Sequence, residues 1–132
     1  MLSRLRNNHG VALVEFALVL PILLVLLFGI IEFGLILYFQ GVVSAASREG
    51  ARRGITVGRP ADIKEWVEGT YCPGLIPGCV ATPTYGTQLA GDPLTVSVQY
   101  EYDYVVIANL ILGLAGSGGT ITLTGTTTMY YE

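Results

Sequence analysis

The apolar positions of the chain form one long run near its start. From Val11 to Ile31 nearly every side chain is apolar, Glu15 carries the only charge, and the next charged residue is Glu32. A helix needs about 20 mostly apolar residues to cross the hydrocarbon of a bilayer. The pattern therefore predicts a transmembrane helix over residues 11–31.

The helix is expected to continue beyond the membrane. No proline interrupts residues 33–54, so we predict one helix over 11–54. Its outer part carries an apolar stripe at helical spacing, suited to packing on a globular domain; the stripe consists of Leu35, Phe39, Val42 and Ala46. Polar residues are expected to face elsewhere: Gln40, Ser44, Ser47 and Arg48. The remaining arginines, Arg52 and Arg53, are expected to be solvated, with Glu49 and Arg53 able to pair at a spacing of four.

The patterns after Gly54 change to those of a small mixed domain. Pro60 suits the first turn of a short helix that ends near 69–71, with Ile63, Trp66 and Val67 on one face. Residues 80–93 are rich in glycine and proline and are predicted to form turns. Leu94 to Tyr104 alternates apolar and polar residues, which predicts a strand.

The last segments complete a predicted antiparallel pair. Thr120 to Tyr131 is threonine-rich and should pair with the 94–104 strand. Val105 to Leu114 is apolar but too short to span a membrane, and it fits a buried connection, a short helix or an exposed patch equally well. Gly116 to Gly119 is interpreted as a connector.

Together these elements predict an α+β protein. A long N-terminal transmembrane helix continues into a small outer domain with a short helix and an antiparallel β-hairpin or small sheet. The predicted division is a basic leader over 1–10, the helix over 11–54, and the outer domain over 55–132.

Two cysteines, Cys72 and Cys79, enclose two Pro-Gly turns that bring them together. If the domain is exported, a disulfide is the expected product, since an oxidising compartment favours it. Free thiols or half of a metal site are the alternatives. Metal binding is disfavoured because the only histidine, His9, lies in the leader.

Composition narrows the classes of function. Hydrophobic residues make up 52% and charged residues 13%, and the net charge is −3, which gives no electrostatic reason to expect nucleic acid. The acids Glu101, Asp103 and Glu132 could suggest a catalytic carboxylate pair. Glu101 and Asp103 share the polar strand face, which is more often simply solvated. We therefore expect neither an enzyme nor a cofactor.

The start of the predicted helix carries a basic leader and one acid, Glu15, within the apolar run. Arg4 and Arg6 should stay cytoplasmic, which places the C-terminal domain outside. An ionised carboxylate in hydrocarbon costs at least a few kcal/mol and usually has a partner. Cleavage between Gly10 and Val11 would create an amine one helical turn from Glu15, in the same chain or a neighbour. The alternative is that Glu15 lies hydrated at headgroup depth.

These residues also resemble a known processing site. Gly10 precedes Val11-Ala-Leu-Val, then Glu15-Phe16 and Ala17-Leu-Val-Leu-Pro21, and later Gly29-Ile-Ile-Glu32-Phe33-Gly34. The pattern is similar to that of the TadE-like family, pilin-like proteins of Tad (Flp-type) pilus systems within the type IV pilin superfamily. The resemblance is close over residues 10–54.

The resemblance implies a function in pilus assembly. A prepilin peptidase is expected to cut after Gly10, and Glu15 and Phe16 are expected to dock the subunit among other pilin subunits of a homo- or hetero-oligomer. The chain would be a minor pilin or pseudopilin in the bacterial cytoplasmic membrane before assembly, in contact with the Tad assembly machinery. The extracellular pilus is the second expected location. A major subunit, or an uncleaved single-pass membrane protein that presents a binding domain, are the alternatives.

Overall fold

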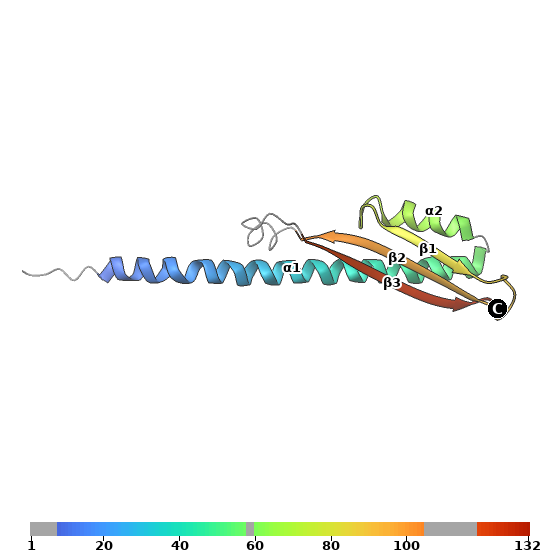
Figure 1. Cartoon of the computed structure of the whole chain (residues 1–132), viewed down its shortest axis with the longest axis horizontal. Coiled ribbons are helices and arrows are strands. Elements are labelled where there is room, and N and C mark those ends of the chain that lie inside the picture. The colour runs from blue at the N-terminus through green and yellow to red at the C-terminus, as the bar shows by residue number, and fades with distance from the viewer. Residues whose placement is uncertain (1–7, 58–59, 105–118) are drawn as a thin grey trace, which may run out of the picture.

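A computed structural model describes residues 8–57, 60–104 and 119–132. In chain order these form α1 (Asn8–Val57), α2 (Pro60–Tyr71), β1 (Val80–Tyr85), β2 (Pro93–Asp103) and β3 (Thr120–Tyr130) (Figure 1). The predicted α+β class is confirmed. The expectations for Val105 to Leu114, and for most of the glycine connector, lie outside the described residues.

The helix α1 is the axis of the molecule. It is 50 residues long, or about 75 Å at 1.5 Å per residue, and it extends the predicted 11–54 helix slightly at both ends. Its N-terminal half stands clear of every other described element, whereas its C-terminal half runs beneath the sheet and beside α2 (Figure 1). The outer domain therefore has no core without this part of α1.

The sheet has three antiparallel strands in the order β1-β2-β3. β2 pairs along its whole length with β3, from Pro93 opposite Tyr130 to Asp103 opposite Thr120, so the predicted antiparallel pair is confirmed. β1 covers only the first part of β2, ending at Val80 opposite Gln99. Residues 100–103 of β2 thus have a sheet partner on one side only.

The prediction of turns throughout residues 80–93 was wrong, because Val80–Tyr85 forms β1. Pro83 made this segment resemble a loop, since proline cannot donate to a sheet ladder. β1 is an edge strand, where one side of the backbone needs no partner and proline is tolerated. The turn itself is confined to the residues that follow, where Gln88 and Gly91 adopt positive φ values of 62° and 90°.

Both helices cover one face of the sheet. The predicted alternation of β2 is confirmed: Leu94, Val96, Val98 and Tyr102 are buried, and they meet Ile63 and Val67 of α2 and Val43 and Ala46 of α1 in one core. The other face is lined with hydroxyl groups. Thr95 pairs with Thr128 at 2.8 Å, and Ser97 with Thr126 at 3.3 Å, across the two longest strands.

The face of α1 that packs on the sheet contains most of the predicted stripe but is wider. Ala46 is buried, and Phe39 and Val42 are half-buried against the core, whereas Leu35 is exposed. Val43, Ser47 and Gly50, which the stripe did not include, are also buried. The expectation that Gln40 and Ser47 face elsewhere was wrong. The Ser47 hydroxyl lies 2.9 Å from that of Thr127, and the Gln40 amide donates to the Thr124 carbonyl at 3.0 Å. Small side chains bring β3 so close to the helix that these polar groups find partners on it.

Gly125 marks the closest approach of β3 to α1. A Cβ atom at this position would lie 2.7 Å from the Val43 carbonyl oxygen and 3.0 Å from the Ser44 Cα. Both are backbone atoms, so they cannot rotate away as a side chain can. Glycine is thus required for the helix and the strand to pack at this distance.

Candidate functional site

The residues of the predicted processing and assembly site lie together at the start of α1. Gly10, Val11, Glu15 and Phe16 are all exposed. Gly10, Val11 and Glu15 line one shallow groove along the helix, together with Val14 and Leu18. The structure thus places the carboxylate of Glu15 on the same helical face as the bond predicted to be cut.

The apolar surface around this groove is unusually large for a water-soluble protein. Val11 is 69% exposed and Phe16 61%, and exposure of large apolar side chains continues to Phe33. Such a continuous surface marks a site of contact with a membrane or with other proteins. Among the described residues, α1 is the one helix that is long and apolar enough to cross a membrane, and its most apolar window is wholly uncovered.

A buried acid lies where the bare part of α1 meets the domain. Glu32 is only 1% exposed, and its Oε1 accepts a hydrogen bond from the Tyr102 hydroxyl at 2.7 Å. The ring of Phe39 lies beside those of Tyr102 and Tyr100, with centroids 5.3 and 5.4 Å away. The hydrogen bond joins the end of the sheet nearest the exposed half of α1 to the helix.

Burial raises the pKa of the Tyr102 hydroxyl, and the hydrogen bond and negative charge of Glu32 raise it further. The hydroxyl therefore stays protonated and remains a donor at neutral pH. Sequence reasoning missed this contact, because Glu32 drew attention only as part of the TadE-like motif. Two sequence features could have indicated this hydrogen bond: an acid at the end of the apolar run, and alternating tyrosines on the 94–104 strand that could donate to it.

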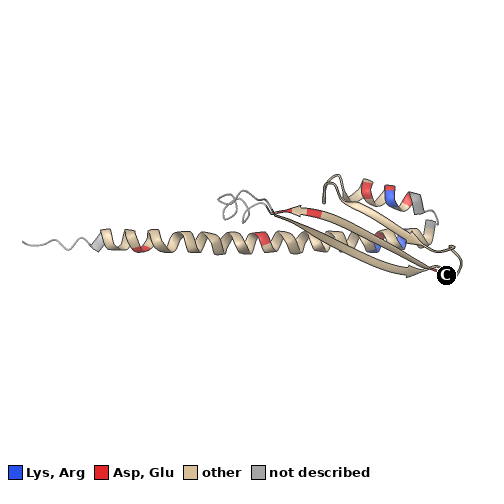
Figure 2. Ribbon diagram, viewed as in Figure 1, with Lys and Arg blue, Asp and Glu red and all other residues tan. Residues whose placement is uncertain are grey.

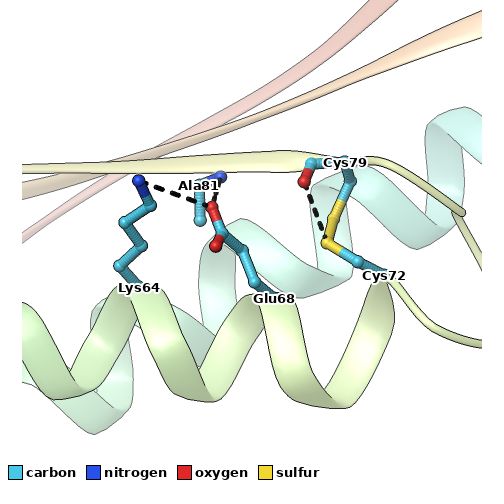
Figure 3. Close-up of a disulfide and its surroundings, with 5 residues drawn as sticks. All are labelled: Lys64, Glu68, Cys72, Cys79 and Ala81. Carbon is cyan, nitrogen blue, oxygen red and sulfur yellow. Dashed lines mark hydrogen bonds and ion pairs between the residues drawn. A yellow bond between two sulfur atoms is a disulfide. The ribbon is translucent and has the colours of Figure 1, made fainter.

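The predicted disulfide is present. Cys72 at the end of α2 and Cys79 just before β1 are joined, with their Cα atoms 5.2 Å apart (Figure 3). Glu68 reinforces this junction, because its Oε1 accepts the Ala81 N–H at 3.1 Å and lies 3.9 Å from the Lys64 ammonium. The helix and the edge strand are thus connected covalently and by hydrogen bonding.

Arg48, Arg52 and Arg53 of α1 are all exposed, as expected, and two of them also make contacts within the chain. The Arg53 guanidinium lies over the Trp66 ring, 4.7 Å from its centroid, and the Arg48 Nε donates to the Ser44 carbonyl at 3.2 Å. The predicted Glu49–Arg53 ion pair is not formed, because the tryptophan ring of α2 takes the arginine instead. Arg52 is exposed.

The acids considered for catalysis remain at the surface. Glu101 and Asp103 are exposed on the hydroxyl-lined face of the sheet, opposite Thr122 and Thr120. Within residues 8–57, 60–104 and 119–132, no three histidine, cysteine or acidic side chains gather as metal ligands.

These features define a class: a protein with one membrane-length helix whose outer half forms the core of a small disulfide-bonded α+β domain. A family model described as "TadE-like protein" matches residues 10–52. The predicted resemblance to the TadE-like family is thus confirmed over this segment, about a third of the chain, and it indicates a pilus-associated structural subunit. Searches found no significant match among curated proteins or among solved structures.

Proposed function

We propose that the chain is a minor pilin or pseudopilin of a Tad (Flp-type) pilus. It is inserted into the bacterial cytoplasmic membrane with its C-terminal domain outside and is cut between Gly10 and Val11 by a prepilin peptidase. The observation that carries this proposal is the TadE-like match, which begins at Gly10, the residue before the proposed cut.

The exposed half of α1 supports assembly through helix packing. Its apolar side chains would lie in lipid before assembly and against other subunits afterwards, so no large apolar surface is left in water at either stage. Cleavage gives Val11 a positive amine, and Glu15 one turn later supplies the compensating charge to it or to the amine of a neighbouring subunit.

The outer domain favours the minor role over the major one. Major pilins of the Flp type are usually much shorter than this 132-residue chain. A small number of subunits that carry such a domain fits a position at the start or tip of a filament. Its partners are the peptidase, other pilin subunits and the Tad assembly machinery.

The proposal is tested by the fate of the Gly10–Val11 bond. Intact mass and N-terminal sequencing are compared for the chain isolated from cells with and without prepilin peptidase. A chain that begins at Val11 only when the peptidase is present supports the proposal. A chain that begins at Met1 in both strains refutes it and leaves an uncleaved membrane-anchored domain.

Glu15 is tested separately from cleavage. Glu15→Ala removes the partner of the new amine and should abolish or strongly reduce incorporation into sheared filaments while membrane insertion is retained. Glu15→Gln is the matched control, because it keeps the size and hydrogen-bonding capacity but not the charge, and it should fail in the same way. Normal piliation in both variants would show that the carboxylate has no role in docking.

A further inference from the structure

A surface pocket lies where β2 extends beyond its edge strand. Residues 100–103 of β2 lack a β1 partner, and the space beside them is bounded by α1 and by the disulfide loop. The pocket has a volume of about 450 Å³ and is lined by Leu35, Phe39, Pro77, Tyr100, Glu101, Tyr102 and Asp103.

The lining of this pocket suits a guanidinium group. The half-buried rings of Phe39 and Tyr100 and the buried ring of Tyr102 lie together on the face of β2 that packs on α1, and Glu101 and Asp103, exposed on the opposite face, line the pocket at the same unpaired edge of the strand. An aromatic face attracts a cation, and a guanidinium stacks on a ring while it donates to carboxylates. The ion pair in the described part of the chain is Lys64–Glu68, so Glu101 and Asp103 have no basic partner among those residues.

The complementary charges lie on α1. Arg48 and Arg52 are both exposed and lie one helical turn apart. Arg52 is two residues from each of the buried Gly50 and Gly54. Two residues correspond to about half a turn, so Arg52 lies on the side of α1 away from the sheet. Two like charges at this spacing repel each other, and an opposite charge placed across them relieves that repulsion.

The pocket and these arginines cannot meet within one molecule. The pocket lies at the level of Leu35 and Phe39 on α1. Phe39 is 13 residues before Arg52, which corresponds to about 20 Å along a helix. Figure 2 shows the same separation, with basic residues on the far half of α1 and acids at the end of β2 nearest the bare helix. A second copy shifted along the axis would bring the two groups together.

We propose that the pocket of one subunit receives Arg52, flanked by Arg48, from a second copy of this chain. This inference rests on the proposed function, since membrane insertion holds the copies parallel before assembly. The second copy lies displaced by about 20 Å toward the membrane, as the distance along α1 between the pocket and Arg52 requires. The contact fixes the axial register that the apolar helices alone leave free to slide.

The test converts the contact into a covalent bond. Arg52→Lys keeps the charge and supplies an amine, and a zero-length carbodiimide joins an amine to a carboxylate that touches it. Cells that assemble the pilus are shifted from unlabelled to ¹⁵N medium so that both populations of the full-length chain enter the same filaments, and the sheared filaments are treated with the reagent. Mass spectrometry should find mixed-isotope peptides that join position 52 to Glu101 or Asp103.

Matched variants give the control. Glu101→Gln with Asp103→Asn removes the carboxylates that the carbodiimide activates, so it should abolish this link and thereby confirm the assignment of the cross-linked peptides. The native Lys64 amine serves as the internal reference for reagent reactivity. The fluorescence of Trp66 checks folding, and since all the substituted residues are exposed, it should not change.

Absence of the 52–101 and 52–103 links, with Lys64 links still formed, overturns the inference, and the pocket would then have another occupant such as a lipid headgroup. A link confined to peptides of one isotope also overturns it, because the contact would then be intramolecular. Cleavage at Gly10 is scored on the same samples. If the chain is cut normally but gives no link, the contact between Arg52 and the pocket is refuted while the proposed function stands.

Discussion

The hydrogen bond between Tyr102 and Glu32 should be a principal connection between the outer domain and the anchor helix. Tyr102→Phe removes only the hydroxyl, and the ring keeps its neighbours, Phe39 at 5.3 Å and Tyr104 at 6.2 Å. With Tyr102 at 3% and Glu32 at 1% exposure, water does not replace the lost donor. Hydrogen bonds to charged groups contribute about 1.5–3 kcal/mol, and we expect Tyr102→Phe to lower the free energy of unfolding by that amount.

The assay is urea unfolding of the full chain in detergent micelles. Trp66, the only tryptophan, reports on the domain through its fluorescence. Tyr100→Phe is the matched control, because Tyr100 lies on the same strand with a half-buried ring, and it should cost less than about 0.5 kcal/mol. In a Glu32→Ala background, Tyr102→Phe should cost far less than in the native chain, giving a coupling of about 1.5 kcal/mol or more.

Two results would refute this reasoning. One is a cost for Tyr102→Phe no larger than that for Tyr100→Phe. The other is additivity of Tyr102→Phe and Glu32→Ala, since it would mean that the two side chains stabilise the domain through separate contacts.

Three further predictions concern the domain itself. The pKa of Tyr102 in the folded state lies above its usual value near 10. The contribution of Tyr102 to the free energy of unfolding should therefore be complete below about pH 10 and be lost as the pH rises further. In urea unfolding, Tyr102→Phe should reduce this loss of stability at alkaline pH. Gly125→Ala should destabilise the domain by about 1–3 kcal/mol through its clash with the α1 backbone, whereas Gly69→Ala, which meets nothing within 4 Å, should be neutral or stabilising; equal effects would argue against the close approach. Replacing Cys72 and Cys79 together by serine should cost on the order of 2 kcal/mol by freeing the loop in the unfolded chain, measured as a shift in urea midpoint, and an unchanged midpoint would contradict this account.

Sequence patterns predicted the elements whose signal is local. The unbroken apolar run, with no proline between residues 33 and 54, indicated α1, and the strict alternation from Leu94 onward indicated β2 and its buried face. The disulfide followed from two cysteines brought together by Pro-Gly turns. In each case a few neighbouring residues carry the whole argument.

The remaining features depend on contacts between distant residues. Glu32 and Tyr102 are 70 positions apart, and no local pattern pairs them. β1 was missed because Pro83 is excluded from central strands, and only the strand order shows that β1 lies at an edge. Ser47 and Gln40 were misplaced because the C-terminal half of α1 has small or apolar residues on more than one side, and the sheet determines which side is buried.

The strands run along α1 at a shallow angle (Figure 1). A subunit held in a filament by its bare helix and pulled through its outer domain would therefore experience tension nearly parallel to β2 and β3. Sliding these strands requires the hydrogen bonds of their 11 paired positions to break together rather than one after another. The geometry that buries the sheet on the helix thus also makes the domain resistant to mechanical extension.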